Sequence, residues 1–322
     1  MIDRRVLLAS LAALPLAAPA RAQASFPDKP IRLIVPFGPG GLADVTARAV
    51  AEKAAGVLGQ PLVIVNQPGA GGVAAAKAVQ AAPADGHTLA LFTNGTAISV
   101  PLVKALGFDP VKEFVPVSSL GFFDFLIVTG ADHGYRTLGD VLAAAKTKPG
   151  GINAGTINIG STQNLTAELI KSDSGSSITI VPFKNSGDAV AAVLRKDVDI
   201  VIEGYVAVRA MLADKRLVAL AATGPKRSAM LPDVPTAAEA GLKGFDVTSW
   251  NAVFAAAGTP QPVIAALNAA FNTALADGEV KQKLLALGIE ARGGKPEEIG
   301  RRLAEDIAKW GAVIAKAGIE RQ

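Results

Sequence analysis

The sequence predicts an α/β protein of two lobes, with mostly parallel sheets, flanking helices and a cleft between the lobes. A chain of 322 residues is too long for one typical hydrophobic core. Short apolar segments alternate with alanine-rich segments of helical length, a pattern typical of parallel strands joined by right-handed crossovers. Half of the residues are hydrophobic and 19% are charged, which favours globular domains over disorder.

The N-terminal segment has the features of a secretory signal peptide. Arg4 and Arg5 precede an apolar stretch from Val6 to Ala18, and small-residue cleavage sites follow it. The stretch is shorter than the roughly 20 apolar residues that a membrane-spanning helix needs. We therefore expect residues 1–24 to be removed, with cleavage near Ala22 or Ala24. The paired arginines leave both the general and the twin-arginine export routes open.

The first block of the mature chain repeats a unit of strand, turn and helix. Strands are expected at 31–37, 62–65 and 87–92, and the turns that follow them at 38–41, 66–72 and 93–96. These turns are rich in glycine, asparagine and threonine. Because open α/β sheets bind ligands at the carboxyl ends of their strands, we expect the turns to lie together at one edge of the sheet.

A second α/β block begins near Phe125. Its strands are expected at 125–128, within a strand-turn unit at 151–160, and at 178–183, 198–202 and 217–223, with helices between them. The chain is expected to return to the first block near 247–254 and to end in helices, where Val263, Leu267, Phe271 and Leu275 form an apolar stripe. We therefore assign 25–124 with 248–322 to lobe 1 and 125–247 to lobe 2.

The turns favour an anion-binding site. A helix N-terminus offers unpaired N–H groups and a partial positive charge, and glycine lets an anion approach the backbone. Each terminus contributes about 0.3 to 1 kcal/mol when exposed and up to ~2 when partly buried. Several termini together could supply much of the roughly 8 kcal/mol that micromolar affinity requires. A single such turn is commonly structural, but so many in one chain favour a site for a carboxylate.

The sequence has few residues of the kinds that metal binding, nucleotide binding or catalysis requires. The chain has two histidines and no cysteine, which disfavours metal sites, disulfides and acyl-transfer triads. Gly38 and Gly40 lack the third glycine of a dinucleotide fingerprint, and no P-loop occurs. Ser161 lacks the nucleophile elbow of hydrolases. We expect neither enzymatic activity nor a cofactor. The formal net charge of +4 is dispersed, so nucleic acid is not an expected partner.

Three charged residues near the expected turns each allow two interpretations. Asp44, in a first helical turn, is favourable to the helix dipole, or pairs with an ammonium or hydroxyl group of a ligand. Glu203 ends an apolar strand. It lies at the mouth of the cleft, or it is a solvated charge at the end of the strand. Lys184, at another strand end, neutralises a second ligand carboxylate or forms a surface salt bridge.

A distinctive segment, FPDKPIRLIVPFGPGGLAD, runs from Phe26 to Asp44. It resembles the most diagnostic motif of the substrate-binding proteins of tripartite tricarboxylate transporters, the Bug family. Further similar blocks follow in family order across the whole mature chain: NQPGAGG at 66–72, ADGHTL at 84–89, FDP at 108–110, VPFK at 181–184, LPDVPT at 231–236, EAG at 239–241 and GTP at 258–260.

The resemblance implies a two-lobed periplasmic binding protein fold, type II-like, that closes on a small carboxylate-containing metabolite. It also implies a periplasmic protein that works with the membrane subunits of a secondary transporter, and we expect a monomer. The residues expected at the ligand are Phe37, Gly38, Gly40, Gly41, Asp44, Asn66, Ala70, Thr93, Asn94 and Thr96 from one lobe, with Ser161, Thr162, Asn164, Lys184 and Glu203 from the other.

Some positions depart from the family pattern. Asn164 replaces a common histidine, Asn185 a common glycine and His87 a common tyrosine, while Glu203 replaces a frequent aspartate or small residue. The last change could disfavour a di-anionic ligand or select one that carries an amine. Two other functions stay open: a sensory module that delivers its closed state to a receptor, and an exported α/β enzyme that acts on a small organic acid.

Overall fold

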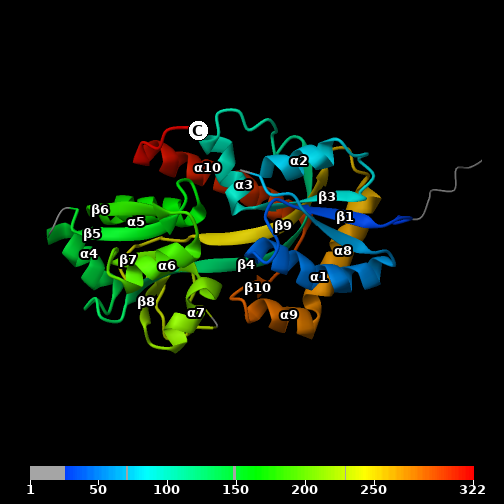
Figure 1. Ribbon diagram of the computed structural model, residues 1–322. Coiled ribbons are helices and arrows are strands. Elements are labelled where there is room, and N and C mark those ends of the chain that lie inside the picture. Colours follow the sequence, from blue (N-terminus) through cyan, green and yellow to red (C-terminus); the bar gives the residue numbers. More distant parts are fainter. Residues whose placement is uncertain (1–25, 70–71, 148–149, 229) are drawn as a thin grey trace, which may run out of the picture.

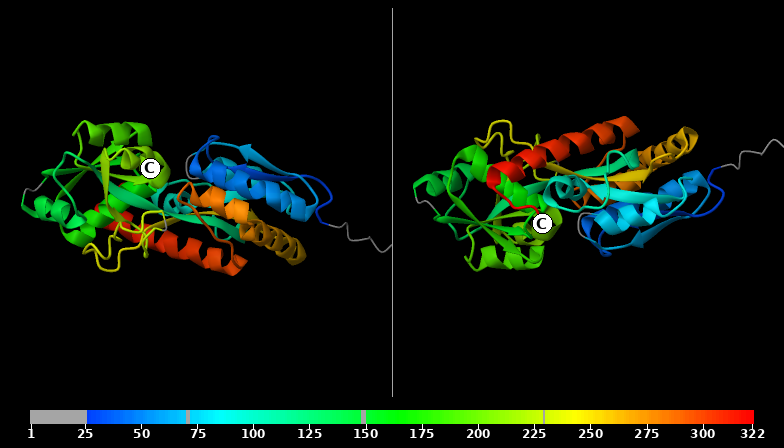
Figure 2. Two further views of the ribbon diagram at one scale, coloured as in Figure 1. Left: turned by 90° about the horizontal axis from the view of Figure 1, so that it is seen from below. Right: turned by 90° about the horizontal axis from the view of Figure 1, so that it is seen from above.

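The computed structural model describes residues 26–69, 72–147, 150–228 and 230–322 of the chain (Figure 1). The signal peptide expected at 1–24 lies outside the described residues. Two groups of elements lie on either side of the centre of the molecule, and one long strand runs through both (Figures 1 and 2). None of the helices in the described part is long and apolar enough to cross a membrane.

The first group is built on strands β1 (Ile31–Val35), β2 (Leu62–Asn66), β3 (Thr88–Thr93), β9 (Thr248–Ala256) and the short β10 (Glu290–Ala291). Its helices are α1 (Leu42–Leu58), α2 (Val73–Gln80), α3 (Asn94–Leu102), α8 (Gln261–Ala276), α9 (Gly278–Leu285) and α10 (Pro296–Ala317). The second group has strands β5 (Ile152–Ile157), β6 (Ile178–Phe183), β7 (Ile200–Gly204) and β8 (Leu217–Ala222). Its helices are α4 (Leu138–Thr147), α5 (Thr162–Ser174), α6 (Ser186–Leu194) and α7 (Tyr205–Ala213).

Strand β4 (Phe114–Gly130) joins the two groups. Its residues up to Asp124 pair with β9, and its residues from Phe125 onward pair with β7 and β8. The strand order is therefore β2-β1-β3-β9-β4-β7-β5-β6, with β8 and β10 also paired to β4. We expected mostly parallel sheets, but the sheet is mixed. Only β2-β1-β3 and β7-β5-β6 are parallel runs, because β4 and β9 pair in antiparallel orientation with their neighbours.

The local sequence explains why these segments form these elements. In β1 the side chains of Ile31, Leu33, Ile34 and Val35 are buried, and β-branched residues suit such strands. Helix α1 is rich in alanine, the best helix former. It ends at Gly59, whose φ of 69° is left-handed and whose N–H donates to the Ala55 carbonyl.

The two faces of the sheet are packed differently. On one face a single hydrophobic core runs through both groups, from Phe92 and Phe254 to Ile127 and Ile202, and includes Trp310 of α10. On the other face the core under α1 and α8 is separate from the core under α6 and α7. Helix α10 contacts both α3 and α5 and so lies against both groups (Figure 1). The two groups thus share a hydrophobic core on one face only, while on the other face Arg209 of α7 donates to the Ala286 carbonyl at the end of α9.

Asp124 lies where the pairing partner of β4 changes, opposite Thr248. Burial raises the pKa of this carboxyl from 3.8 to about 6, with smaller contributions from the charges of Asp246 and Glu290. A raised carboxyl pKa means that the folded state binds the proton more tightly than the unfolded state. The stability from this group is therefore present below about pH 4 and is lost as the pH rises through about 6.

We predict that Asp124→Asn raises the free energy of unfolding relative to wild type at pH 7 but not at pH 4. The gain should not exceed about 3 kcal/mol, because each pKa unit corresponds to about 1.36 kcal/mol and solvent screening reduces it at a partly buried site. Chemical denaturation at pH 4, 5, 6 and 7 measures the difference. The exposed Asp233→Asn serves as the control. A difference for Asp124→Asn that does not change with pH would contradict the assignment.

Candidate functional site

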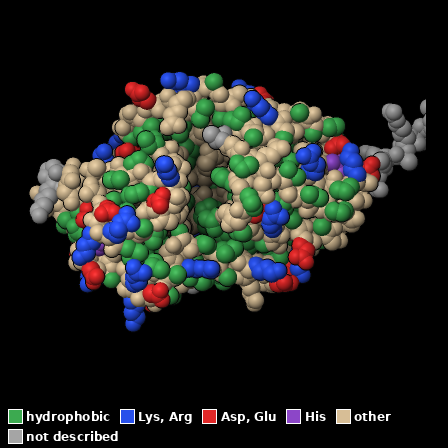
Figure 3. Space-filling model, viewed as in Figure 1, with side chains coloured by type: hydrophobic (Ala, Val, Ile, Leu, Met, Phe, Trp, Pro, Cys, Tyr) green, Lys and Arg blue, Asp and Glu red, His purple; other side chains and the backbone are tan. Residues whose placement is uncertain are grey.

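A cavity of about 460 Å³ lies between the two groups of elements, where the space-filling view is hollowed (Figure 3). Its walls come from the starts of five helices, α1, α3, α5, α6 and α7, and its remaining surface from β4, β5, β7, β9 and the loop after β1. It is lined by Phe37, Gly40, Gly41, Leu42, Ala43, Thr93, Gly95, Phe123, Phe125, Ile157, Ser161, Thr162, Gln163, Ser186, Glu203, Gly204, Val206, Ala207, Ser249 and Asn251.

The sequence-predicted residues at this cavity come from both lobes. They are Phe37, Gly40, Gly41, Thr93, Ser161, Thr162 and Glu203. None of the described residues that line the cavity is a lysine, arginine or histidine. The positive groups nearest to the cavity are therefore backbone amides at the helix starts.

The helices differ in how their first turns are capped. The side chains of Thr93, Ser161 and Asn185 accept hydrogen bonds from amides of α3, α5 and α6. Gly41 and Gly204, which precede α1 and α7, provide no side-chain cap. Gly40 has a φ of 83°, a left-handed conformation that favours glycine. The start of α1 therefore presents backbone to the cavity without a side-chain cap, whereas at α7 the Gly204 amide donates to Glu203 Oε2 at 3.2 Å.

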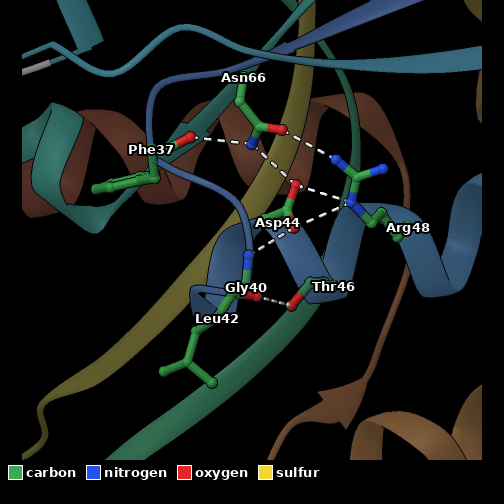
Figure 4. Close-up of polar contacts among 7 residues, drawn as sticks. All are labelled: Phe37, Gly40, Leu42, Asp44, Thr46, Arg48 and Asn66. Atoms are coloured by element: carbon green, nitrogen blue, oxygen red, sulfur yellow. Dashed lines mark hydrogen bonds and ion pairs between the residues drawn. The ribbon is translucent and has the colours of Figure 1, made fainter.

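Asp44 and Asn66 hold the loop between β1 and α1 in place (Figure 4). One Asp44 oxygen accepts from the Gly40 amide at 2.9 Å, and the Arg48 Nε donates to both oxygens at 3.0 Å. The Asn66 amide donates to Asp44 Oδ1 at 2.8 Å and to the Phe37 carbonyl at 3.0 Å. These two residues are not among those that line the cavity, so their polar groups serve the loop instead.

The Asp44 carboxylate is well satisfied although it is only 2% exposed. Burial acts to raise its pKa, but hydrogen bonds from Arg48, the Gly40 amide and Asn66 outweigh burial, and the pKa is lowered. A carboxyl group with a lowered folded pKa contributes stability above its unfolded pKa, and this contribution is lost as the pH falls through the folded value.

Asn94, Thr96 and Asn164 also bind within the chain. Asn94 accepts from Trp310 Nε1 at 2.8 Å and donates to Thr162 Oγ1 at 3.2 Å, which links α3, α10 and α5. Thr96 accepts from the Thr93 amide in the capping box of α3. Asn164 accepts from the Gly160 amide at 3.1 Å.

The remaining predicted residues lie elsewhere. Lys184, at the end of β6, is exposed and is not among the lining residues, nor is Gly38. Ala70 lies outside the described residues.

Sequence reasoning missed the part of the wall that β4 and β9 supply. Phe123, Ser249 and Asn251 lie within these strands, where no turn or cap marks them. Gln163, Ser186 and Gly204 could have been found, because each follows an expected strand by a few residues and lies at the start of α5, α6 or α7. A wall with five helix N-termini and no cationic side chain can bind a small anion through backbone amides.

Fold and site together define a two-lobed binding protein with an interlobe cavity, and the comparisons with known proteins agree. Residues 46–319 match the family described as "Tripartite tricarboxylate transporter family receptor". BugT of Bordetella pertussis is 34% identical over 94% of this chain and 93% of its own length. A protein of Pseudomonas sp. strain P51, "UPF0065 protein in tcbD-tcbE intergenic region", is 34% identical over 98% of this chain and 95% of its own.

Solved structures are similar too. The R. palustris protein Rpa4515 with adipate is 33% identical, with a TM-score of 0.79, over 92% of this chain and 99% of that one. MatC from Rhodopseudomonas palustris with bound malate is 33% identical, with a TM-score of 0.74, over 90% and 100%. This chain belongs to the tripartite tricarboxylate transporter receptor family, whose members are periplasmic solute-binding proteins. The predicted family and the two-lobed α/β fold class are confirmed.

We predict that Asp44→Asn lowers the free energy of unfolding by about 2 kcal/mol at pH 7, because the loop loses charge-assisted hydrogen bonds. The loss should shrink toward pH 3, because below about 3.9 the aspartate of the unfolded chain takes up a proton before the folded Asp44 carboxylate, whose pKa is lowered, does so. Urea denaturation at both pH values measures it. Asp188→Asn, an exposed aspartate in the first turn of α6, is the matched control and should change stability by less than about 0.5 kcal/mol. Equal effects of the two variants would contradict a special role for Asp44.

Proposed function

We propose that this chain is a periplasmic solute-binding protein that captures a small carboxylate-containing metabolite in the cavity between its lobes. The convergence of five helix N-termini on one cavity without a cationic side chain carries the proposal. The ligand carboxylate would accept hydrogen bonds from amides at the starts of α1 and α3 in one lobe. Related proteins with adipate and with malate support a carboxylate as the ligand.

The proposed role includes export, a monomeric state and a membrane partner. The signal peptide would be removed near Ala22 or Ala24, and the mature protein would work as a monomer without a cofactor and without catalysing a reaction. It would deliver its ligand to the membrane subunits of a tripartite tricarboxylate transporter. The lobes would comprise 25–124 with 248–322, and 125–247.

We further propose that the lobes close by bending where they are joined. The expected hinge segments are Phe122 to Phe125 in β4 and Thr248 to Asn251 in β9. Phe123, Phe125, Ser249 and Asn251 from these segments line the cavity, so a bound ligand would contact the hinge. Closure would be favoured because contacts to both lobes exist only in the closed state.

Binding is tested first with the wild-type mature protein. Thermal-shift measurements against mono- and dicarboxylates, amino acids and aromatic acids should find ligands that raise the unfolding temperature. Isothermal titration should then give dissociation constants of about 1 μM for the best of them, which correspond to roughly 8 kcal/mol. If no acid in the panel stabilises the protein, the proposed function is wrong.

A substitution in the proposed carboxylate subsite provides the second test. We predict that Gly41→Leu weakens binding of the best ligand at least ten-fold, because a side chain at the start of α1 would cover the amides. A Cβ at Gly41 approaches only the Gly38 carbonyl, at 3.8 Å, so the fold should tolerate the change. Gly56→Leu, an exposed position in the same helix with open space at the Cβ, is the matched control. Unchanged affinity in Gly41→Leu would place the carboxylate elsewhere.

A further inference from the structure

Glu203 is a buried carboxylate with one unused oxygen. It precedes the last residue of β7, is only 2% exposed and lines the cavity. Oε2 accepts from the Gly204 amide at 3.2 Å, whereas Oε1 has no hydrogen-bond partner among the described residues. A buried carboxylate oxygen without a partner is costly, and most buried polar side-chain atoms in proteins are hydrogen-bonded. The unpaired oxygen therefore indicates that a ligand contributes a hydrogen-bond donor near Glu203.

The carboxylate occupies a place where an anion is favoured. Gly204 is the N-cap of α7, and Ser186 at the start of α6 lines the same cavity. The partial positive charge of these helix starts stabilises a negative charge there. Burial nevertheless raises the pKa of Glu203, and the neighbours that offset this in part are Ser186, the Gly204 amide and Gln163, none of which is charged. Glu203 thus places a carboxylate at the start of α7, where an anion is favoured.

A second carboxylate from a ligand would meet Glu203 with no cation to separate the charges. The residues that line the cavity include no lysine, arginine or histidine in the described part of the chain. Like charges at hydrogen-bond distance in a site of low dielectric constant repel strongly. An N–H donor that reaches the Glu203 carboxylate would instead be attracted to it. The same wall also carries apolar side chains, those of Phe37, Leu42, Phe123, Phe125 and Ile157.

We infer that Glu203 fills the anion subsite of the second lobe and selects a monocarboxylate whose far end donates N–H hydrogen bonds, an amine or an amide, over a dicarboxylate. The inference rests on the proposed function, because it takes one ligand carboxylate to bind at the first lobe. It deepens that function by excluding, for this chain, ligands that carry a carboxylate at each end.

The experiment compares matched probes by isothermal titration with the mature protein at pH 7.5. The four-carbon set is succinate, succinamate and 4-aminobutyrate, and the six-carbon set is adipate, adipamate and 6-aminohexanoate. In at least one set, wild type should bind the amide or the amine at least ten-fold more tightly than the dicarboxylate. Tighter binding of the amine than of the amide would indicate an ion pair with Glu203, and similar binding a neutral hydrogen bond.

Glu203→Gln removes the charge and keeps the shape. In this variant the dicarboxylate should gain at least ten-fold in affinity and the amine should lose at least ten-fold. Glu305→Gln, at an exposed position of α10, removes the same charge away from the cavity and should keep the wild-type ranking. The wild-type ranking stands as a test by itself if Glu203→Gln does not fold.

Two outcomes would overturn the inference. If wild type prefers the dicarboxylate in both sets, or if Glu203→Gln folds and leaves the ranking unchanged, Glu203 does not select the ligand, while the proposed function stands. If neither these probes nor the wider panel of acids bind, the proposed function fails and the selection by Glu203 fails with it.

Discussion

The site depends on the partial positive charge that backbone amides create at the starts of five helices around one cavity. The described wall has no cationic side chain, so backbone amides, together with neutral donors such as Ser161, Thr162 and Asn251, supply its attraction for an anion. They are effective because the sheet fixes the helix starts and because Gly41 leaves the start of α1 without a side-chain cap. A rigid array of amides does not have to give up side-chain freedom when a ligand binds, which preserves more of the interaction energy as affinity.

The same architecture restricts how the lobes can move. On the face that carries α10, one continuous core and the hydrogen bonds of Asn94 to Trp310 and Thr162 tie the lobes together. On the cavity side the cores are separate. Rotation about β4 and β9 would therefore leave the shared face in contact and change the gap on the other side, where the ligand is expected. Asp124, with its raised pKa, lies at this junction.

Much of the fold could be predicted from the sequence because its signals are local. Apolar strands followed by glycine turns gave the α/β class and placed Gly40, Gly41 and Ser161 at the cavity. The antiparallel orientation of β4 and β9 was not predictable, since it depends on pairing between residues more than a hundred positions apart. Asn94 looked like a ligand residue for the same reason as Thr93, but its partner Trp310 lies 216 residues away. The sequence shows that a turn residue is polar, whereas tertiary contacts decide which group forms its hydrogen bonds.

Asp44 and Glu203 show that the hydrogen-bond partners of a polar residue decide whether it can serve a ligand. Both are acids at the start of a helix, and both are 2% exposed, so burial acts on each to raise the pKa. In Asp44 the hydrogen bonds from Arg48, Gly40 and Asn66 outweigh burial and the pKa falls. The hydrogen bonds of this carboxylate are therefore supplied by the chain itself. In Glu203 the neighbours offset burial only in part, the pKa stays raised and Oε1 is left without a partner. Glu203 lines the cavity and Asp44 does not. The carboxylate that lacks a hydrogen-bond partner is therefore the one that a ligand can contact.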